Sequence, residues 1–528
     1  MERHTSRIVS HVLSMLREHR RFFLWTTLAG LALRLFSFAY FPTVTDDSRV
    51  YLDLAGNWLR HGVYGQTQLG QIVPADTRLP GYPAFLAAIS AIFGDGNSVG
   101  SANIRAVLLT QILLDLLTCL IIADLARRIV PGRRAGRAAF FLAAMCPFLA
   151  NYAAAVLSEN LEIFFTALAL DCAVATLDHR DDSRRALAAG WLLWVGTGVS
   201  IAACIMLRPD GGILLAAVLL CIAVTTAEGA IRFRRGKRAS AAKGNASDNR
   251  LIAAAKRCAT PNRTGSEASP PDVKPRPDAK HEPFRRLAAG GIIVALVALA
   301  PLAPWTVRNF RTLHHFQPLA PRYANESDEA APRGFNRWVK TWIADYVSVE
   351  EIYWNVPGEK IDGEKLPSRA LDTSRAATMA VIAGYNQSQD LTPRMDARFG
   401  ELAAESIRAH PVRYYLGLPV LRIADMWLRP RTELLPPDIR WWEFNDDTRE
   451  SVLAVGFGLL NLLYVAAALA ALVRRHPRIR YLGLLVTFLL LRTAFLGTIE
   501  NPEPRYTLEC YPVIIVLASA LFAERSVP

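Results

Sequence analysis

Cysteine is scarce in this sequence, and its distribution excludes two common kinds of site. Seven cysteines occur in 528 residues, and none forms a CxxC pair or has a partner histidine at the spacing of a metal site. Most lie singly inside apolar runs, which is typical of small buried side chains. The sequence therefore predicts neither a disulfide framework nor a zinc site.

Charged residues are also few, and the sequence contains many long apolar runs. Only 20% of the residues are Asp, Glu, Lys or Arg, whereas 52% are hydrophobic. The hydrophobic residues gather in runs of roughly 17–22, the length that crosses a hydrocarbon core of about 30 Å. The first run has no small-residue cleavage site before Phe41 and Pro42, so we expect a retained span and not a signal peptide. The chain is predicted to be a polytopic membrane protein.

The net charge of +13 is concentrated in one segment and does not indicate nucleic-acid binding. Residues 232–286 contain 15 Lys and Arg against 5 Asp and Glu, and only two aromatic side chains, Phe233 and Phe284, one near each end. A disordered cytoplasmic loop near anionic lipid head groups accounts for this composition. We expect membrane lipids as partners and no nucleic acid.

The basic residues also orient the predicted spans. Five arginines precede the first apolar run, which places the N-terminus in the cytoplasm. The run 79–94 has only about a dozen apolar residues after Pro83, too few to span, so we predict a helix lying on the outer surface. About ten spans result, with both chain ends inside. They cover residues 22–41, 104–125, 138–156, 159–177, 186–207, 211–228, 287–304, 451–473, 480–498 and 507–523.

This topology divides the chain into three parts. Residues 1–305 form an N-terminal transmembrane catalytic module, which contains the first outer loop (42–103) and the basic loop (232–286). Residues 306–450 form a small, polar outer domain on the membrane, and residues 451–528 carry the last spans. The tryptophans of the outer domain fit the membrane interface and a core of its own equally well.

Charged residues from distant parts of the chain fall on the predicted outer face. Charges at such depths tend to face a cavity and to mark function, although acid–arginine pairs that only stabilise the fold give the same pattern. The middles of the predicted spans carry few charges, with Asp115 and Asp171 as exceptions. The outer set comprises Asp46, Asp47, Arg49, Arg78, Glu159, Arg208, Asp210, Arg308, Glu500, Glu503 and Arg505.

Sugar transfer from a phosphate-linked carrier lipid requires such a set beside a membrane. One carboxylate accepts the proton of the attacking hydroxyl, and cationic groups stabilise the departing phosphate. Attack opposite the phosphate would invert the anomeric centre. A flippase or transporter of lipid-linked sugars also needs a cationic outer cavity, but charges on one side favour an enzyme over alternating access. The acidic pair directly after the first span disfavours an O-antigen ligase or polymerase.

Four short motifs resemble those of the GT-C superfamily of polyprenyl-phosphate-dependent glycosyltransferases. The nearest branch contains bacterial relatives of protein O-mannosyltransferases and the lipid A aminoarabinose transferases. DDSRVYLDLAGNWLRHGVYG (46–65) resembles the first outer loop of the family, and RLPGYPAFLAAISAIFG (78–94) its RPPGYPxFL element. APWTVRNF (303–310) and EPRYTLECYP (503–512) resemble its PWxxRN and RYxxxxxP elements. The resemblance implies an all-α fold of GT-C type, with interfacial helices in the first outer loop.

The resemblance also implies a role for each candidate residue. Asp46 is predicted to be the catalytic base, and Asp47 and Glu159 to bind substrate or a divalent metal. A metal at Asp46 and Asp47 is compatible with the pattern but not required by it. The predicted ligands of the carrier phosphate are Arg78, Arg505 and Arg308. The expected partners are a polyprenyl-phosphate sugar donor and a glycan, lipid or protein acceptor, at the periplasmic face of the cell inner membrane.

Overall fold

The computed structural model describes residues 18–178, 184–228, 282–321, 331–444, 447–475 and 479–523. Helices make up nearly all of its regular structure, and within these ranges the only sheet is a two-stranded hairpin. The predicted disordered loop at 232–286 lies outside the described residues, except for its end from residue 282.

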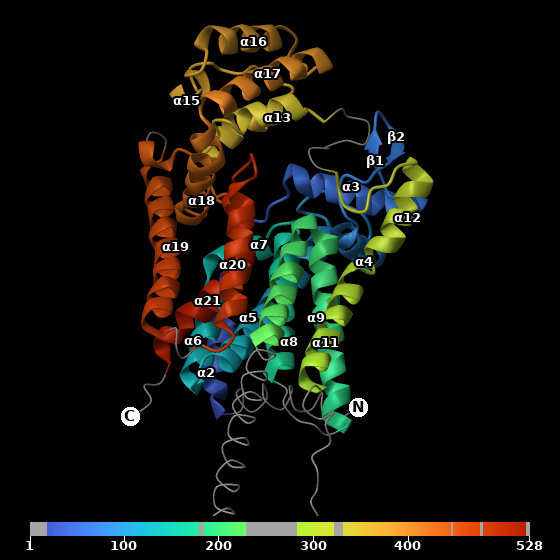
Figure 1. The fold of residues 1–528 in the computed structure, drawn as a ribbon, viewed down its shortest axis with the longest axis vertical. Coiled ribbons are helices and arrows are strands. Elements are labelled where there is room, and N and C mark those ends of the chain that lie inside the picture. Colours follow the sequence, from blue (N-terminus) through green and yellow to red (C-terminus); the bar gives the residue numbers. More distant parts are fainter. Residues whose placement is uncertain are drawn as a thin grey trace, which may run out of the picture.

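Eight helical segments among the described residues are long and apolar enough to cross a membrane. Most of them stand side by side and form the lower bundle in Figure 1. They confirm the prediction of an all-α, multi-pass membrane protein. They are α2 (Arg20–Tyr40), α5 (Ala102–Ile129), α8 (Glu159–Asp178), α9 (Arg184–Leu207), Pro209–Glu228, the pair α11 (Glu282–Leu299) and α12 (Leu302–Leu313), α19 (Thr448–Arg475) and Pro504–Phe522.

Two of the predicted spans do not reach this length, so the count of about ten is not confirmed. The predicted span at 138–156 is divided between α6 (Arg133–Ala144) and α7 (Pro147–Ala153). The division occurs at Pro147 because proline lacks the N–H that would continue a helix. The span predicted at 480–498 is the 16-residue helix α20 (Leu482–Gly497).

The first outer loop holds three elements that lie across one end of the bundle (Figure 1). They are α3 (Asp46–His61), the hairpin of β1 (Gly65–Gln68) and β2 (Gln71–Pro74), and the short α4 (Gly81–Phe93). Thr45 begins α3 with a capping box, in which its Oγ1 accepts from the Ser48 N–H at 3.3 Å and its own N–H donates to Ser48 Oγ at 2.9 Å. This cap fixes the first two helical residues, Asp46 and Asp47.

The orientation of α5 can be tested by cysteine labelling. Asn97 and Pro131 are exposed and lie beyond opposite ends of this 28-residue helix. We expect Asn97→Cys to react with a membrane-impermeant maleimide on intact cells, and Pro131→Cys to react only after permeabilisation. The parent chain measures the background of the natural cysteines. The reverse pattern would place the first outer loop in the cytoplasm.

The outer domain stands above the bundle and has its own hydrophobic core. Its main helices are α13 (Arg333–Val339), α16 (Arg375–Ser388) and α17 (Pro393–Ala409). Trp338 and Trp342 are 1% and 0% exposed within this core, whereas Trp354 and Trp442 are 45% and 44% exposed. Trp338 and Trp342 therefore belong to the core of the domain, whereas the interfacial setting of Trp354 and Trp442 stays a prediction.

One buried arginine ties the outer domain to the bundle. Arg422 belongs to α18 (Leu418–Leu428), and its guanidinium donates to the carbonyls of Ile343 at 2.9 Å and Lys340 at 2.5 Å. It also donates to the carbonyl of Gly497, at the end of α20, at 3.4 Å. Because these carbonyls are buried acceptors, the contacts hold residues 340–343 of the outer domain against α18 and the end of α20.

Candidate functional site

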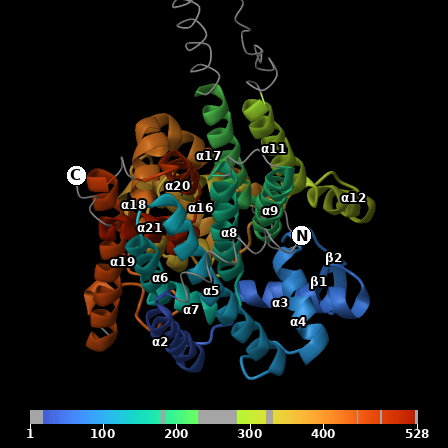
Figure 2. The same ribbon diagram turned by 90° about the horizontal axis from the view of Figure 1, so that it is seen from below.

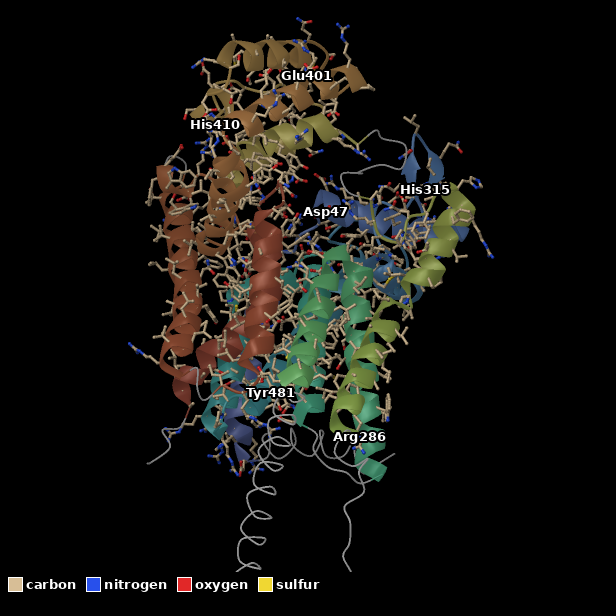
Figure 3. All side chains as sticks on the ribbon, viewed as in Figure 1. Asp47, Arg286, His315, Glu401, His410 and Tyr481 are labelled. Atoms are coloured by element: carbon tan, nitrogen blue, oxygen red, sulfur yellow. The ribbon has the colours of Figure 1, made fainter. Side chains whose placement is uncertain are left out.

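Asp47 lies between two arginines that come from distant parts of the chain. Its Oδ1 accepts a hydrogen bond from Arg78 Nη2 at 3.2 Å, and its Oδ2 accepts one from Arg505 Nη2 at 2.9 Å. Arg78 follows the hairpin, and Arg505 lies in η7 (Pro504–Cys510). Figure 3 places Asp47 beneath the outer domain, at the start of α3. The first outer loop and the last span thus meet at this carboxylate.

The two arginines dominate the electrostatics of Asp47. Burial raises the pKa of this carboxyl, but the charges of Arg505 and Arg78 outweigh burial and lower the pKa to about 2, from an ordinary value of 3.8. The side chain of Asp47 keeps 31% of its surface exposed, that of Arg78 25% and that of Arg505 16%. Asp47 is therefore ionised at neutral pH and accessible to a ligand.

A chain of ion pairs continues from Arg505 into the protein. Arg505 Nε pairs with Glu503 and lies 3.6 Å from Glu159 Oε1. Glu159 Oε1 is 3.5 Å from Arg208 Nη1. Arg208 Nε in turn lies 3.4 Å from Glu162 Oε1, and the guanidinium stacks 4.5 Å over the Tyr506 ring.

Arg492 forms the deepest part of this network. Its Nη1 lies 2.7 Å from Asp210 Oδ2 and its Nη2 lies 2.7 Å from Glu509 Oε2. Thr166 Oγ1 donates to the other oxygen of Glu509 at 2.9 Å. Arg492 is 1% exposed, so its charge is compensated almost entirely by protein groups. The network rigidly supports the accessible group of Asp47, Arg78 and Arg505.

Asp46, the predicted catalytic base, lies outside this network. Its side chain is 95% exposed and pairs with the equally superficial Arg49 at 2.9 Å. Consecutive residues of an α-helix point about 100° apart, so only one member of the acidic pair can face Arg78 and Arg505. The structure brings Asp47 to the arginines in place of Asp46.

Some of the other predicted residues join the Asp47 cluster, and others lie outside it. Arg308 donates to the backbone carbonyls of Ala75, at 2.7 Å, and Tyr64, and so ties the first outer loop to α12 instead of joining the cluster. No group of three or more His, Cys, Asp or Glu that could hold a metal occurs among the described residues, and Asp46 and Asp47 contact different partners. The predicted residues that the structure brings together are Asp47, Arg78, Glu159 and Arg505.

Sequence reasoning missed Glu162, Arg492 and Glu509. These residues lie within predicted spans, where an ionisable side chain is costly and usually functional or paired, and that position was the available signal. Asp115 and Asp171 were predicted as the charged exceptions in the middles of the spans, but Arg34 and Arg492 also lie well inside theirs. Asp115 itself pairs with Arg34 of α2 at 2.5 Å.

Comparisons with solved structures gave two kinds of similar protein. Archaeal oligosaccharyltransferase AglB from Archaeoglobus fulgidus, in complex with an inhibitory peptide and a dolichol-phosphate, aligns with 95% of this chain at 12% identity and a TM-score of 0.46. This chain covers 50% of that protein, about half its length. ArnT from Cupriavidus metallidurans, bound to undecaprenyl phosphate, aligns with 94% of this chain and 77% of its own at 15% identity and a TM-score of 0.36. The comparison with curated proteins gave no match.

A comparison with protein families gave one match of direct relevance to the cluster. Residues 77–238 match the family model of dolichyl-phosphate-mannose-protein mannosyltransferases. The matched segment begins immediately before Arg78 and includes Glu159, Glu162 and Arg208. Over residues 77–238, this match confirms the predicted resemblance to polyprenyl-phosphate-dependent glycosyltransferases.

Proposed function

We propose that this protein is an inverting membrane glycosyltransferase, which moves a sugar from a polyprenyl-phosphate carrier to an acceptor hydroxyl at the outer face of the inner membrane. The observation that carries the proposal is the position of Asp47 between Arg78 and Arg505. The Asp47 carboxylate and the guanidinium groups of Arg78 and Arg505 are partly open to solvent. They lie together at the end of an apolar helical bundle. The match of residues 77–238 to a family of lipid-phosphate-dependent transferases supports the same chemistry.

In this proposal Arg78 and Arg505 hold the phosphate of the donor. The donor phosphodiester carries one negative charge, and the free carrier phosphate gains a second when the sugar leaves. Arginine presents several N–H donors in a plane, which suits bidentate binding of phosphate oxygens. Because the charge grows as the C1–O bond breaks, preorganised arginines stabilise the transition state more than the bound donor.

Asp47 is the proposed general base. The oxygen of the acceptor forms the new bond to C1, the electron pair of the old C1–O bond leaves with the phosphate, and the acceptor proton passes to Asp47. A carboxylate held at a pKa of about 2 by two arginines is a weak base. A bound donor phosphate shares the same arginine charges, which raises the basicity of Asp47 when the donor is in place.

The proposed function is tested with purified protein in lipid nanodiscs. The protein is mixed with a panel of undecaprenyl-phosphate sugars and acceptor extracts, and release of free undecaprenyl phosphate is followed. Acceptor-dependent release with inversion at C1 supports the proposal. Movement of the intact donor between the leaflets of proteoliposomes, without release of carrier phosphate, would favour a flippase instead.

Arg78→Ala should mainly weaken binding of the carrier phosphate. The substitution removes one of the two cations at Asp47, and a charge-assisted hydrogen bond contributes roughly 1.5–3 kcal/mol, or about 10- to 100-fold in affinity. Binding of undecaprenyl phosphate to nanodiscs is the measurement. Arg49→Ala, which removes an exposed arginine two residues from Asp47, is the matched control and should bind normally. A loss of acceptor affinity alone would contradict the assignment of Arg78.

A further inference from the structure

A cavity lies between residues 344–369 of the outer domain and α18, apart from the Asp47 cluster. It has a volume of about 660 Å³, which is within the range of about 300–1,000 Å³ typical of small-ligand pockets. One wall comes from α14 (Tyr346–Ser348), η3 (Val349–Tyr353) and the start of α15 (Ser368–Leu371). The opposite wall comes from α18 and η5 (Trp441–Glu443). In Figure 1, α15 lies above α18 on the side of the molecule nearest α19.

The charged groups of this cavity are largely neutralised by one another. Arg440 forms a bidentate pair with Glu351, with Nε–Oε1 at 2.7 Å and Nη2–Oε2 at 2.8 Å. Arg369 Nη2 donates to Asp345 Oδ2 at 2.9 Å. A third pair joins Arg429 Nη1 to Asp425 Oδ1 at 3.6 Å, and Lys365 also lines the cavity. Four cationic side chains therefore face three carboxylates. The charges that line the cavity thus sum to nearly zero, unlike those of a site built for phosphate.

Two adjacent aromatic side chains complete the cavity. Trp442 is 44% exposed and lies at right angles to Trp441, with ring centroids 5.7 Å apart. The indole N–H of Trp441 is shielded from solvent and has no hydrogen-bond partner in the described part of the chain. A buried donor without a partner costs free energy, so a ligand oxygen that reached this N–H after a small rotation of the indole would gain a hydrogen bond.

We propose that this cavity binds neutral sugar residues of a glycan acceptor, an inference that rests on the proposed transfer reaction. Sugar hydroxyls both donate and accept, so they can bridge the carboxylate and guanidinium edges of paired residues such as Glu351 and Arg440. The apolar C–H face of a pyranose can stack on an indole ring such as that of Trp442. The unpartnered Trp441 N–H supplies a donor for a further ring or hydroxyl oxygen.

A continuous segment links this cavity to the Asp47 cluster. Arg429 and Pro430 line the cavity, and the next residue, Arg431, faces the other way. Arg431 Nη1 donates to the carbonyl of Pro504 at 2.8 Å, immediately before Arg505. The segment 429–431 therefore lines the cavity on one side and contacts the residue before Arg505 on the other.

The test measures saccharide binding separately from transfer. Full-length protein in nanodiscs is titrated with lactose, cellobiose, mannobiose and maltotriose, and binding is followed by tryptophan fluorescence and saturation-transfer NMR. We expect saturable binding of at least one saccharide, weakened about tenfold or more by Trp442→Ala and also weakened by Trp441→Phe, which removes the N–H. Trp354→Ala is the matched control, because Trp354 is equally exposed and lies outside the cavity.

The outcomes separate this inference from the proposed function. Asp47→Asn should bind saccharide normally, and Trp442→Ala should release carrier phosphate with a raised KM for a glycan acceptor and an unchanged affinity for undecaprenyl phosphate. Absence of saccharide binding, or binding that Trp442→Ala does not alter, overturns the sugar site even if transfer occurs. Saturation by inorganic phosphate or by anionic lipid in place of saccharide also overturns it. Saccharide binding without any release of carrier phosphate would leave the cavity assigned and the transfer reaction refuted.

Discussion

Asp47→Asn is expected to lower the rate of sugar transfer by about a thousandfold, within the range of roughly 10²–10⁴ attributed to a general base. The amide has nearly the shape of the carboxylate but cannot accept the proton of the attacking hydroxyl. It also removes the negative charge that Arg78 and Arg505 share. Release of undecaprenyl phosphate in single-turnover experiments is the measurement.

The matched control for this prediction is the neighbouring residue. Asp46→Asn makes the same chemical change one position earlier, in a side chain that is 95% exposed and contacts only the surface residue Arg49 in the described structure. We expect its turnover to remain within about twofold of the parent protein, because exposed pairs contribute little. If Asp46→Asn were inactive and Asp47→Asn active, the base would be Asp46, as the family motif first implied.

Arg492→Met should cause the largest loss of stability among the substitutions considered. The change leaves Asp210 and Glu509 buried without their main cation, each of which lies 2.7 Å from the guanidinium. Removing one partner of a buried pair typically costs about 3–5 kcal/mol, because the remaining charge is uncompensated. The free energy of unfolding, measured by reversible denaturation in detergent, should fall by this amount.

A surface arginine provides the comparison for Arg492. Arg133 forms an ion pair with Glu18, but its side chain is 71% exposed and that of Glu18 is 49% exposed. Arg133→Met should therefore change the free energy of unfolding by less than about 1 kcal/mol. Equal effects of the two substitutions would mean that the ion network around Arg492 is not a stabilising unit.

The sequence predicted the spans well where length and hydrophobicity alone decide the structure. Span α2 ends at Tyr40, one residue before the predicted boundary, and α8 runs to Asp178, one residue beyond it. The prediction failed at 138–156, where apolar character is continuous but Pro147 interrupts the helix. Hydropathy averages over such a break, because it measures transfer into lipid and not backbone hydrogen bonding.

The composition of the site was only partly accessible from the sequence. Asp47, Arg78 and Arg505 could be placed on one face of the membrane, and the structure joins them. The choice between Asp46 and Asp47 depends on the direction in which α3 leaves its cap at Thr45, which packing on α4 determines. Arg431 illustrates the same limit. It is 2% exposed, and it joins residues about 30 to 80 positions away that no sequence pattern connects.

Figure 2 shows the molecule from below, with the outer domain on the far side of the bundle. Helices α2 and α21 (Tyr511–Ser519) lie on the same side of the bundle in this view. Residues 47, 78 and 505 share one small cluster, so a nascent chain that has not reached residue 505 lacks the second of the two proposed phosphate ligands. Under the proposed roles, membrane-inserted intermediates cannot act on carrier lipids during synthesis. Expression of the first 480 residues and the remainder as two polypeptides should therefore restore turnover only when the fragments associate.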